Sequence, residues 1–331
     1  MDGEFVRYVH DEAMTVCGRT PAYVDDFVPF LAMELGLDVP SRVTYKWIDA
    51  DSVRRSCAAE AYGCAVGRVA YAEDPLLLHE VVHAIGSANA MNVQPFLREG
   101  LAEAYDPLGR FGLGPRYLIR AEGERLPDPR PLLDDWSYAS GYGLPASFVA
   151  FLLARHGPES FVALARATSA SPVFEMRATF RKIYGTELDA EAELFMAGAP
   201  CDGDEFAVRP YDCAMPSVPW SGGVWEFEAM MDCGEAEVAG GIDKAEGADY
   251  MVRSVVTDVT AGAYTLRVLG DGEVGIQIGA CGGCPWTRVD VGARPGTPVS
   301  TTLEAGQHFV RIVAPSSLST MVTVTLEPTV P

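Results

Sequence analysis

The sequence predicts an α+β protein in which mixed, helical and all-β stretches follow one another along the chain. Residues 1–73 combine strand-like runs, rich in β-branched and aromatic residues, with one helical pattern. Residues 74–200 repeat apolar residues at helical spacing, whereas residues 201–331 carry short alternating runs between Gly, Pro, Asp and Ser. We therefore expect a first domain over residues 1–200, with a small α/β layer and a helical part, and an all-β sandwich domain over residues 201–331.

The α/β layer follows from the runs FVRYVH, VTYKWI and CAVGRVAYA, which have the composition of strands. Between the first two runs, residues 22–35 carry apolar side chains at helical spacing, and Gly36 supplies a stop signal. Proline inside a helix removes a hydrogen bond and crowds the preceding turn, so we expect Pro29 to kink this helix.

The helical part is expected to begin at Asp74, an N-cap residue followed by Pro75 in the first turn, and its first helix is expected to end at Gly86. A second helix is expected over residues 95–105. Further helices are expected over Tyr138–His156, Pro158–Thr168, Pro172–Tyr184 and Leu188–Met196. The run AGAPCDGD then breaks the last helix and puts the domain boundary near residues 197–205.

Charge narrows the class of partners. The chain has 25 Lys and Arg against 46 Asp and Glu, a net charge of −21, and the acidic residues are scattered along it. Such a surface repels phosphate backbones and anionic lipids, so we expect neither nucleic acid nor a membrane surface as a partner. No apolar run approaches the roughly 20 residues that span a bilayer, so no membrane span is expected. A soluble substrate is therefore the expectation that remains.

Eight cysteines indicate an oxidising compartment, because they sit largely in polar, turn-rich surroundings and show no repeated metal-binding spacing. We expect Cys57 and Cys64 to bridge a short loop, and the other cysteines to find partners within their own domain. The CGGC run at 281–284 has no following helix and no second C-x-x-C, so disulfides are expected there rather than redox chemistry or zinc. The start of the chain lacks a signal-peptide pattern, as in the mature form of an extracellular, periplasmic or cell-surface protein.

The stretch LLLHEVVHAI places two histidines and a glutamate inside an apolar helix. His79 and His83 are four residues apart, so both imidazoles project from one helical face and can share one metal ion. Glu80 lies on the flank of that face, from which its carboxylate can reach a water on the metal. H-E-x-x-H arises by chance in roughly one of 200 chains of this composition, so a third ligand is needed to distinguish a metal site from a chance match. A purely structural role is disfavoured, because each of these buried polar groups would then need its own partner.

Glu99 is the candidate third ligand. It lies within FLREGLAEAY, which reads as a second helix after His83 and a short loop. Catalytic tetrahedral zinc takes three protein ligands and keeps one position open. Glu103 follows Glu99 by one helical turn, and its carboxylate is expected to orient the N–H of a histidine ligand.

These two motifs resemble those of the gluzincin metallopeptidases, thermolysin-like in their site, and especially the peptidase MA-like families. In those families an H-E-x-x-H helix precedes a W/F-L-x-E-G-x-A helix, and the resemblance covers about residues 42–197, including the later SGYGLPASFVAFLLARHGPESFVALA. It implies a zincin-like helical subdomain in which His79, His83 and Glu99 hold Zn²⁺. It also implies that Glu80 is the general base that deprotonates the metal water for attack on a peptide carbonyl.

The same families usually add a tyrosine or histidine that stabilises the oxyanion of the tetrahedral intermediate. Tyr142 and Tyr138, in WSYASGYG, are the candidates, with Tyr142 favoured; either one could equally pack at the start of a helix. His156 is a third candidate, but it precedes Gly157 and Pro158, where a histidine commonly meets the last carbonyls of a helix.

The sequence thus predicts a secreted zinc metallopeptidase, a monomer that acts on a peptide or protein substrate. Its sandwich is similar to those appended to secreted bacterial peptidases and is expected to position the enzyme on a substrate, surface or partner. The alternative is a catalytically inactive, metal-binding protein of gluzincin fold that serves as a surface, carbohydrate or protein binding module. Trp220, Trp225 and Trp286 could form a sugar-stacking platform, although core tryptophans are the more common outcome. Arginines within residues 110–130 could meet a peptide carboxylate, although a solvated connection is the favoured interpretation.

Overall fold

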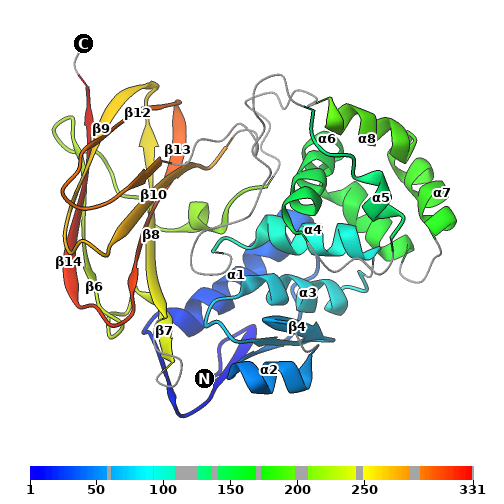
Figure 1. Cartoon of the computed structure of the whole chain (residues 1–331), viewed down its shortest axis with the longest axis horizontal. Coiled ribbons are helices and arrows are strands. Elements are labelled where there is room, and N and C mark those ends of the chain that lie inside the picture. The colour runs from blue at the N-terminus through cyan, green and yellow to red at the C-terminus, as the bar shows by residue number, and fades with distance from the viewer. Residues whose placement is uncertain are drawn as a thin grey trace.

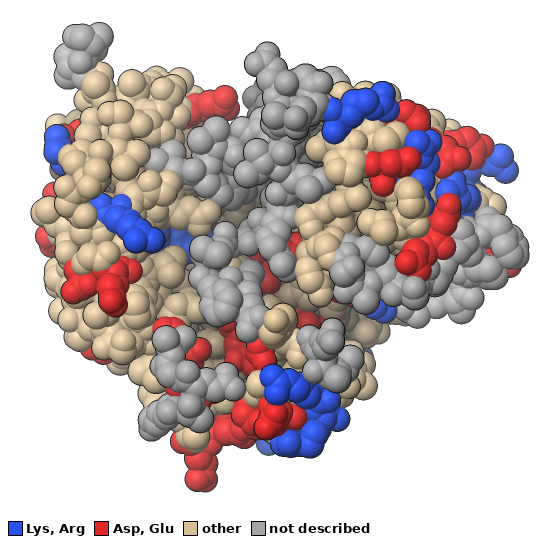
Figure 2. Space-filling view, viewed as in Figure 1, with Lys and Arg blue, Asp and Glu red and all other residues tan. Residues whose placement is uncertain are grey.

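The fold is α+β, with helices gathered on one side of the molecule and a β-rich part on the other (Figure 1). Among the described residues, no helix has the length and apolar character needed to cross a membrane. Figure 2 shows acidic side chains at several places on the visible face, in keeping with the net charge of −21. The computed structural model describes residues 1–57, 61–91, 93–108, 125–135, 141–168, 173–197, 208–243, 249–282 and 291–329.

A four-stranded sheet near the N-terminus underlies the first half of the chain. Its order is β1-β3-β5-β4, in which β1, β3 and β5 run parallel and β4 is antiparallel to β5. The strands are β1 (Val6–His10), β3 (Val43–Trp47), β4 (Gly63–Val66) and β5 (Val69–Ala72). Because β4 is at the end of this order, one of its sides has no partner strand within the described chain.

Helix α1 (Thr20–Leu35) packs against β1 and buries Phe27 and Leu31 in the core. The helix ends at Gly36, as expected, and the φ of 62° at this residue is left-handed and suits glycine. Pro29 does not interrupt the helix. Packing of the apolar face against the sheet therefore outweighs the local penalty of the proline.

The other described helices of the first half include α2 and α5, which were not predicted, and several of the predicted helices have different bounds. They are α2 (Ala50–Ser56), α3 (Leu78–Ala88), α4 (Pro95–Tyr105), α5 (Arg130–Leu133), α6 (Gly143–Ala167), α7 (Val173–Tyr184) and α8 (Leu188–Met196). The helix expected over residues 95–105 is confirmed as α4. Helix α3 continues two residues past Gly86, and α6 joins two expected helices across a break at Gly157, where φ is 77°.

Helix α3 begins at Leu78, four residues later than the expected start at Asp74. The Asp74 carboxylate accepts the N–H of Leu76 at 2.8 Å, and the Tyr45 hydroxyl accepts the N–H of Leu77 at 2.8 Å. These contacts hold the preceding residues as an ordered linker instead of a first helical turn. The predicted start of the helix was wrong because Tyr45, which is distant in the sequence, accepts an N–H that a helical cap would otherwise satisfy.

Two antiparallel sheets enclose the apolar core of the second half and form the expected β-sandwich. Their orders are β11-β10-β13-β8-β7-β2 and β12-β9-β14-β6. The strands from the second half are β6 (Trp225–Met231), β7 (Ala239–Asp243), β8 (Tyr250–Val259), β9 (Gly262–Leu269), β10 (Gly275–Ala280), β11 (Val291–Ala293), β12 (Val299–Leu303), β13 (Gly306–Pro315) and β14 (Thr320–Pro328). Buried residues such as Trp225 and Ile312 fill the space between the sheets.

The two halves of the chain share a sheet and a disulfide. Strand β2 (Met14–Val16) comes from the N-terminal stretch but pairs antiparallel with β7 of the sandwich. Cys17 follows β2 directly and is bonded to Cys233. The expectation that cysteines pair only within their own domain was therefore wrong at this bond, because strand pairing carries the N-terminal segment onto the sandwich.

The other two described disulfides, Cys57–Cys64 and Cys213–Cys281, agree with the sequence prediction. Cys201 and Cys284 lie outside the described residues, as does most of the boundary expected near residues 197–205.

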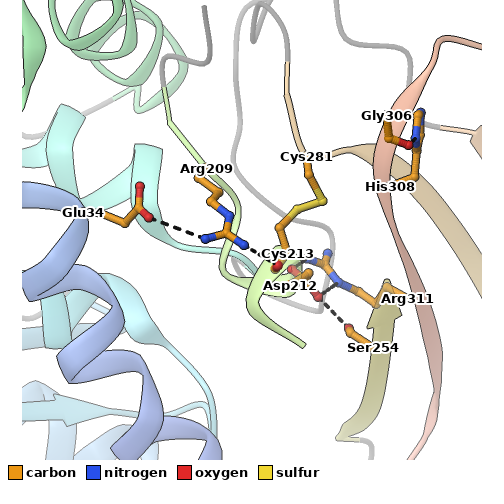
Figure 3. Close-up of a disulfide and its surroundings, with 9 residues drawn as sticks. All are labelled: Glu34, Arg209, Asp212, Cys213, Ser254, Cys281, Gly306, His308 and Arg311. Atoms are coloured by element: carbon orange, nitrogen blue, oxygen red, sulfur yellow. Dashed lines mark hydrogen bonds and ion pairs between the residues drawn. A yellow bond between two sulfur atoms is a disulfide. The ribbon is translucent and has the colours of Figure 1, made fainter. Parts of the chain in front are cut away.

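A buried ion pair within the second half of the chain lies where the sandwich meets the helical part (Figure 3). Arg311 on β13 is paired with Asp212, and the two side chains are only 2% and 0% exposed. Ser254 on β8 donates its hydroxyl to the same carboxylate at 2.5 Å. Arg311 also donates to the carbonyl of Pro107 at 2.6 Å, two residues beyond the end of α4.

A second connection reaches the linker before α3. The Tyr250 hydroxyl, from β8, lies 3.1 Å from the Asp74 carboxylate, and the Tyr45 hydroxyl donates to the Asp74 carbonyl at 2.6 Å. Sandwich residues thus contact both the chain entering α3 and the chain leaving α4. The sandwich therefore helps to hold the ends of α3 and α4 in place.

Candidate metal centre

Helix α3 fixes the two histidines by burying the apolar residues around them. Leu78, Val81 and Ile85 are fully buried, and the helix lies between α4 and the N-terminal sheet (Figure 1). The side chains of His79 and His83 remain only 9% and 13% exposed. Their spacing of four residues brings the two Nε2 atoms to 3.2 Å from each other.

Helix α4 brings Glu99 to the same point. Its Oε2 atom lies 3.2 Å from Nε2 of His79 and 3.2 Å from Nε2 of His83. The close approach of α4 to α6 depends on Gly100, because a Cβ there would lie 2.5 Å from the carbonyl oxygen of Pro145. The sequence R-E-G therefore places a ligand-type side chain beside a residue that permits tight helix packing.

The three donor atoms have the spacing of a tetrahedral metal site. Ligand atoms about 2.0–2.1 Å from a tetrahedral zinc ion are about 3.3–3.4 Å apart, close to the 3.2 Å separations of His79, His83 and Glu99. Two imidazoles and a carboxylate are also the donor set of catalytic zinc sites. Within the described chain, these three residues form a group that could hold a metal ion.

Glu103 lies on the Nδ1 side of the His79 ring, away from the ligand atoms. Its Oε2 atom lies 3.7 Å from Nδ1 of His79, and its side chain is 2% exposed. A carboxylate at Nδ1 favours the tautomer that leaves the Nε2 lone pair for a metal. Burial alone would lower the pKa of His79, but the carboxylates of Glu103 and Glu99 raise this pKa well above its ordinary value. For Glu99 the two effects have the opposite signs. Burial raises the pKa of its carboxyl, but the two imidazoles lower it more, so the net pKa lies far below its usual range.

Glu80 lies on the cleft side of α3 and is 6% exposed. Burial raises the pKa of its carboxyl, while the charges of His79 and His83 oppose that increase. Gly63 on β4 leaves room for this side chain, because a Cβ at Gly63 would lie 2.8 Å from Cγ of Glu80. A small residue on the neighbouring strand therefore sets the space available to Glu80.

These side chains open into a cleft of about 610 Å³ between β4, α3, α4 and the start of α6. Its lining consists of Gly63, Cys64, Ala65, His79, Glu80, Val82, His83, Gly86, Ser87, Ala90, Met91, Val93, Arg98, Glu99, Leu101 and Tyr142. The Cys57–Cys64 disulfide links β4, which forms one wall of the cleft, to the end of α2.

Of the three candidates for the oxyanion group, Tyr142 lines the cleft. Its ring packs edge-on to the ring of His79, with 5.5 Å between the centroids. Tyr138 lies outside the described residues. His156 does not line the cleft. Its Nε2 lies 3.3 Å from a carboxylate oxygen of Glu191, and its ring packs edge-on against Tyr184.

The other described residues singled out from the sequence do not line the cleft. Trp225 is fully buried in the sandwich core, and the Trp220 indole donates to the Asp258 carbonyl at 2.6 Å; Trp286 is not described. Of residues 110–130, the described Arg125 and Arg130 form ion pairs with acidic neighbours. Arg98 lines the cleft and was not predicted; its signal in the sequence is its position beside Glu99.

No family model matches this chain, and no curated protein matches it. Among solved structures, the chain is similar to a periplasmic inhibitor of g-type lysozyme from Salmonella Typhimurium, with 9% sequence identity, 34% of this chain and 98% of that chain covered, and a TM-score of 0.23. It is also similar to a β-(1,4)-mannanase, GH26-CBM35, from Podospora anserina, with 16% identity, coverage of 34% and 29%, and a TM-score of 0.18. At these scores neither similarity bears on the activity of this chain.

Proposed function

We propose that the chain is a zinc-dependent metallopeptidase that acts outside the cytoplasm on peptide or protein substrates. The observation that carries this proposal is the triangle of donor atoms from His79, His83 and Glu99, with sides of 3.2 Å, which opens into the same cleft as Glu80. Three ligands and an adjacent carboxylate make up the minimal equipment of a zinc hydrolase. The zincin-like identity of the helical subdomain is part of this proposal.

Zinc bound here would supply a Lewis acid that polarises a peptide carbonyl and lowers the pKa of its water to about 7. Glu80 accepts a proton from a water molecule in the cleft as the water oxygen bonds to the peptide carbon. As the carbon–nitrogen bond breaks, Glu80 passes that proton to the leaving nitrogen.

Tyr142 is the candidate donor to the oxyanion. Its ring packs edge-on against the ring of His79 and lines the same cleft as the ligand group. A hydroxyl that donates to the oxyanion stabilises the transition state more than the substrate. We expect Tyr142→Phe to lower kcat with little change in metal content.

Within the described part of the chain, one side of β4 has no partner strand, and this edge supports a peptide as substrate. Gly63, Cys64 and Ala65 line the cleft from this edge strand, and an extended peptide can add a strand to such an edge through main-chain hydrogen bonds. The three described disulfides support a site of action in an oxidising compartment.

The first test is metal content by elemental analysis of the purified protein, beside Glu99→Ala. We expect about one zinc per chain, lost in the variant. The second test is cleavage of a quenched fluorescent peptide library by the parent, by Glu80→Gln and by a control, Glu159→Gln, whose glutamate is exposed on α6.

The proposal predicts that Glu80→Gln keeps the metal and loses about 10²-fold or more in rate, while Glu159→Gln cleaves like the parent. A parent without metal, or a Glu80→Gln variant at full activity, would refute it. A parent that binds zinc but cleaves no peptide would favour the metal-binding alternative without catalysis.

A further inference from the structure

The two oxygens of the Glu99 carboxylate have different partners. Oε2 faces the two histidine nitrogens at 3.2 Å. Oε1 instead accepts two hydrogen bonds from Arg98, one from Nε at 3.2 Å and one from Nη2 at 3.0 Å. The carboxylate is therefore divided between the ligand group and a guanidinium.

A carboxylate can bind a metal through one oxygen or through both. Binding through both would occupy a position that a catalytic site keeps open for water or substrate. Two N–H donors directed at Oε1 engage the lone pairs that the second metal bond would need. The planar guanidinium can direct two N–H groups at one oxygen, whereas an ammonium is a compact charge on a flexible stem.

From this contact we infer that Arg98 is a positioning residue that restricts Glu99 to one-oxygen ligation and so keeps a coordination position open. The inference rests on the proposed function, since it needs a metal at His79, His83 and Glu99. Arg98 acts through Glu99, and its side chain is 45% exposed at the cleft, so its replacement disturbs no packed core.

The test uses cobalt as a spectroscopic probe of the full-length protein. Four-coordinate Co²⁺ absorbs visible light more strongly than five- or six-coordinate Co²⁺. We expect Arg98→Met to weaken the visible absorption of the cobalt protein, and the metal dissociation constant to rise by about 10-fold, as for other groups that orient metal ligands. Arg98→Lys keeps the charge without the planar fork, and we expect its absorption to lie between those of the parent and Arg98→Met.

Arg155→Met is the matched control. The Arg155 side chain is also 45% exposed, and its Nε lies 2.9 Å from the carboxylate of a buried glutamate, Glu191, but it does not line the cleft. We expect this variant to reproduce the cobalt spectrum and the dissociation constant of the parent.

An Arg98→Met protein with the parental spectrum and affinity would overturn the inference, even if its peptide cleavage changed. A parent that binds no cobalt would overturn both the inference and the proposed function. A parent that binds cobalt and shows the Arg98 effect but cleaves no peptide would leave the inference standing and refute only the peptidase.

Discussion

Replacing Arg311 by methionine should destabilise the whole molecule, because it leaves a charged group buried without its partner. Asp212 has a fully buried side chain, and its carboxylate is paired with the Arg311 guanidinium. Removing one member of a buried pair typically costs about 3–5 kcal/mol. The substitution also takes a donor from the Pro107 carbonyl and from the Gln277 side chain, each worth about 1 kcal/mol. We expect the free energy of unfolding to fall by about 5–7 kcal/mol.

The double variant Arg311→Met/Asp212→Leu separates the charge from the packing. Replacement of a buried ion pair by apolar residues of similar volume is often neutral or stabilising, so we expect the double variant to be more stable than either single variant. As a control, Arg177 pairs with Asp134 and Asp189 at a partly exposed position. Its replacement by methionine should cost less than about 1 kcal/mol.

The assay is equilibrium urea unfolding with the disulfides intact, followed by tryptophan fluorescence. Trp47 in the N-terminal sheet and Trp225 in the sandwich are both fully buried, so fluorescence reports on both halves. The reasoning is refuted if Arg311→Met lowers the unfolding free energy by less than about 1 kcal/mol. It is equally refuted if the losses of the two single variants simply add in the double variant.

Three further predictions concern the candidate site and its supports. Gly63→Ala should displace Glu80 and, because the added Cβ would also lie 2.8 Å from the Tyr71 carbonyl oxygen, disturb the pairing of β4 with β5; we expect peptide cleavage to fall, whereas unchanged cleavage would contradict the steric argument. Glu103→Gln should raise the zinc dissociation constant about 10- to 100-fold, measured by competition with a chelator; an unchanged constant would show that this carboxylate does not orient His79. Burial raises the pKa values of Tyr45 and Tyr250 well above 10, so above about pH 10 the unfolded chain loses these protons first and the unfolding free energy falls as the pH rises. Urea midpoints between pH 9 and 11 test this, and Tyr250→Phe should show a shallower decline than the parent.

Several features of the fold could be predicted because their signals are local in the sequence. The bounds of α4 follow from apolar spacing and Pro95, and the end of α1 follows from Gly36. The Cys57–Cys64 bond joins residues seven apart, so the sequence separation alone suggested it. The domain assignment stays a prediction at its boundary, because most of residues 197–205 lie outside the described chain.

The sequence predictions were wrong where a hydrogen-bond or disulfide partner comes from a distant part of the chain. The start of α3 was placed at Asp74, but Tyr45 takes the Leu77 N–H from another element. Cys17 was expected to pair within its own domain, yet its partner Cys233 lies in the sandwich, 216 residues away. Arg98 was overlooked because no periodicity marks a side chain that bonds to its own neighbour.

The sequence by itself determined the members of the candidate metal group, because helical periodicity puts residues four apart on one face. This applies to His79 with His83, and to Glu99 with Glu103. Only the tertiary structure decided that Glu99 lies 3.2 Å from both histidines and that Arg98 donates to the second oxygen of Glu99. Tertiary structure also decided that the sandwich supports both helices, since contacts between residues far apart in the chain depend on packing that no local pattern encodes.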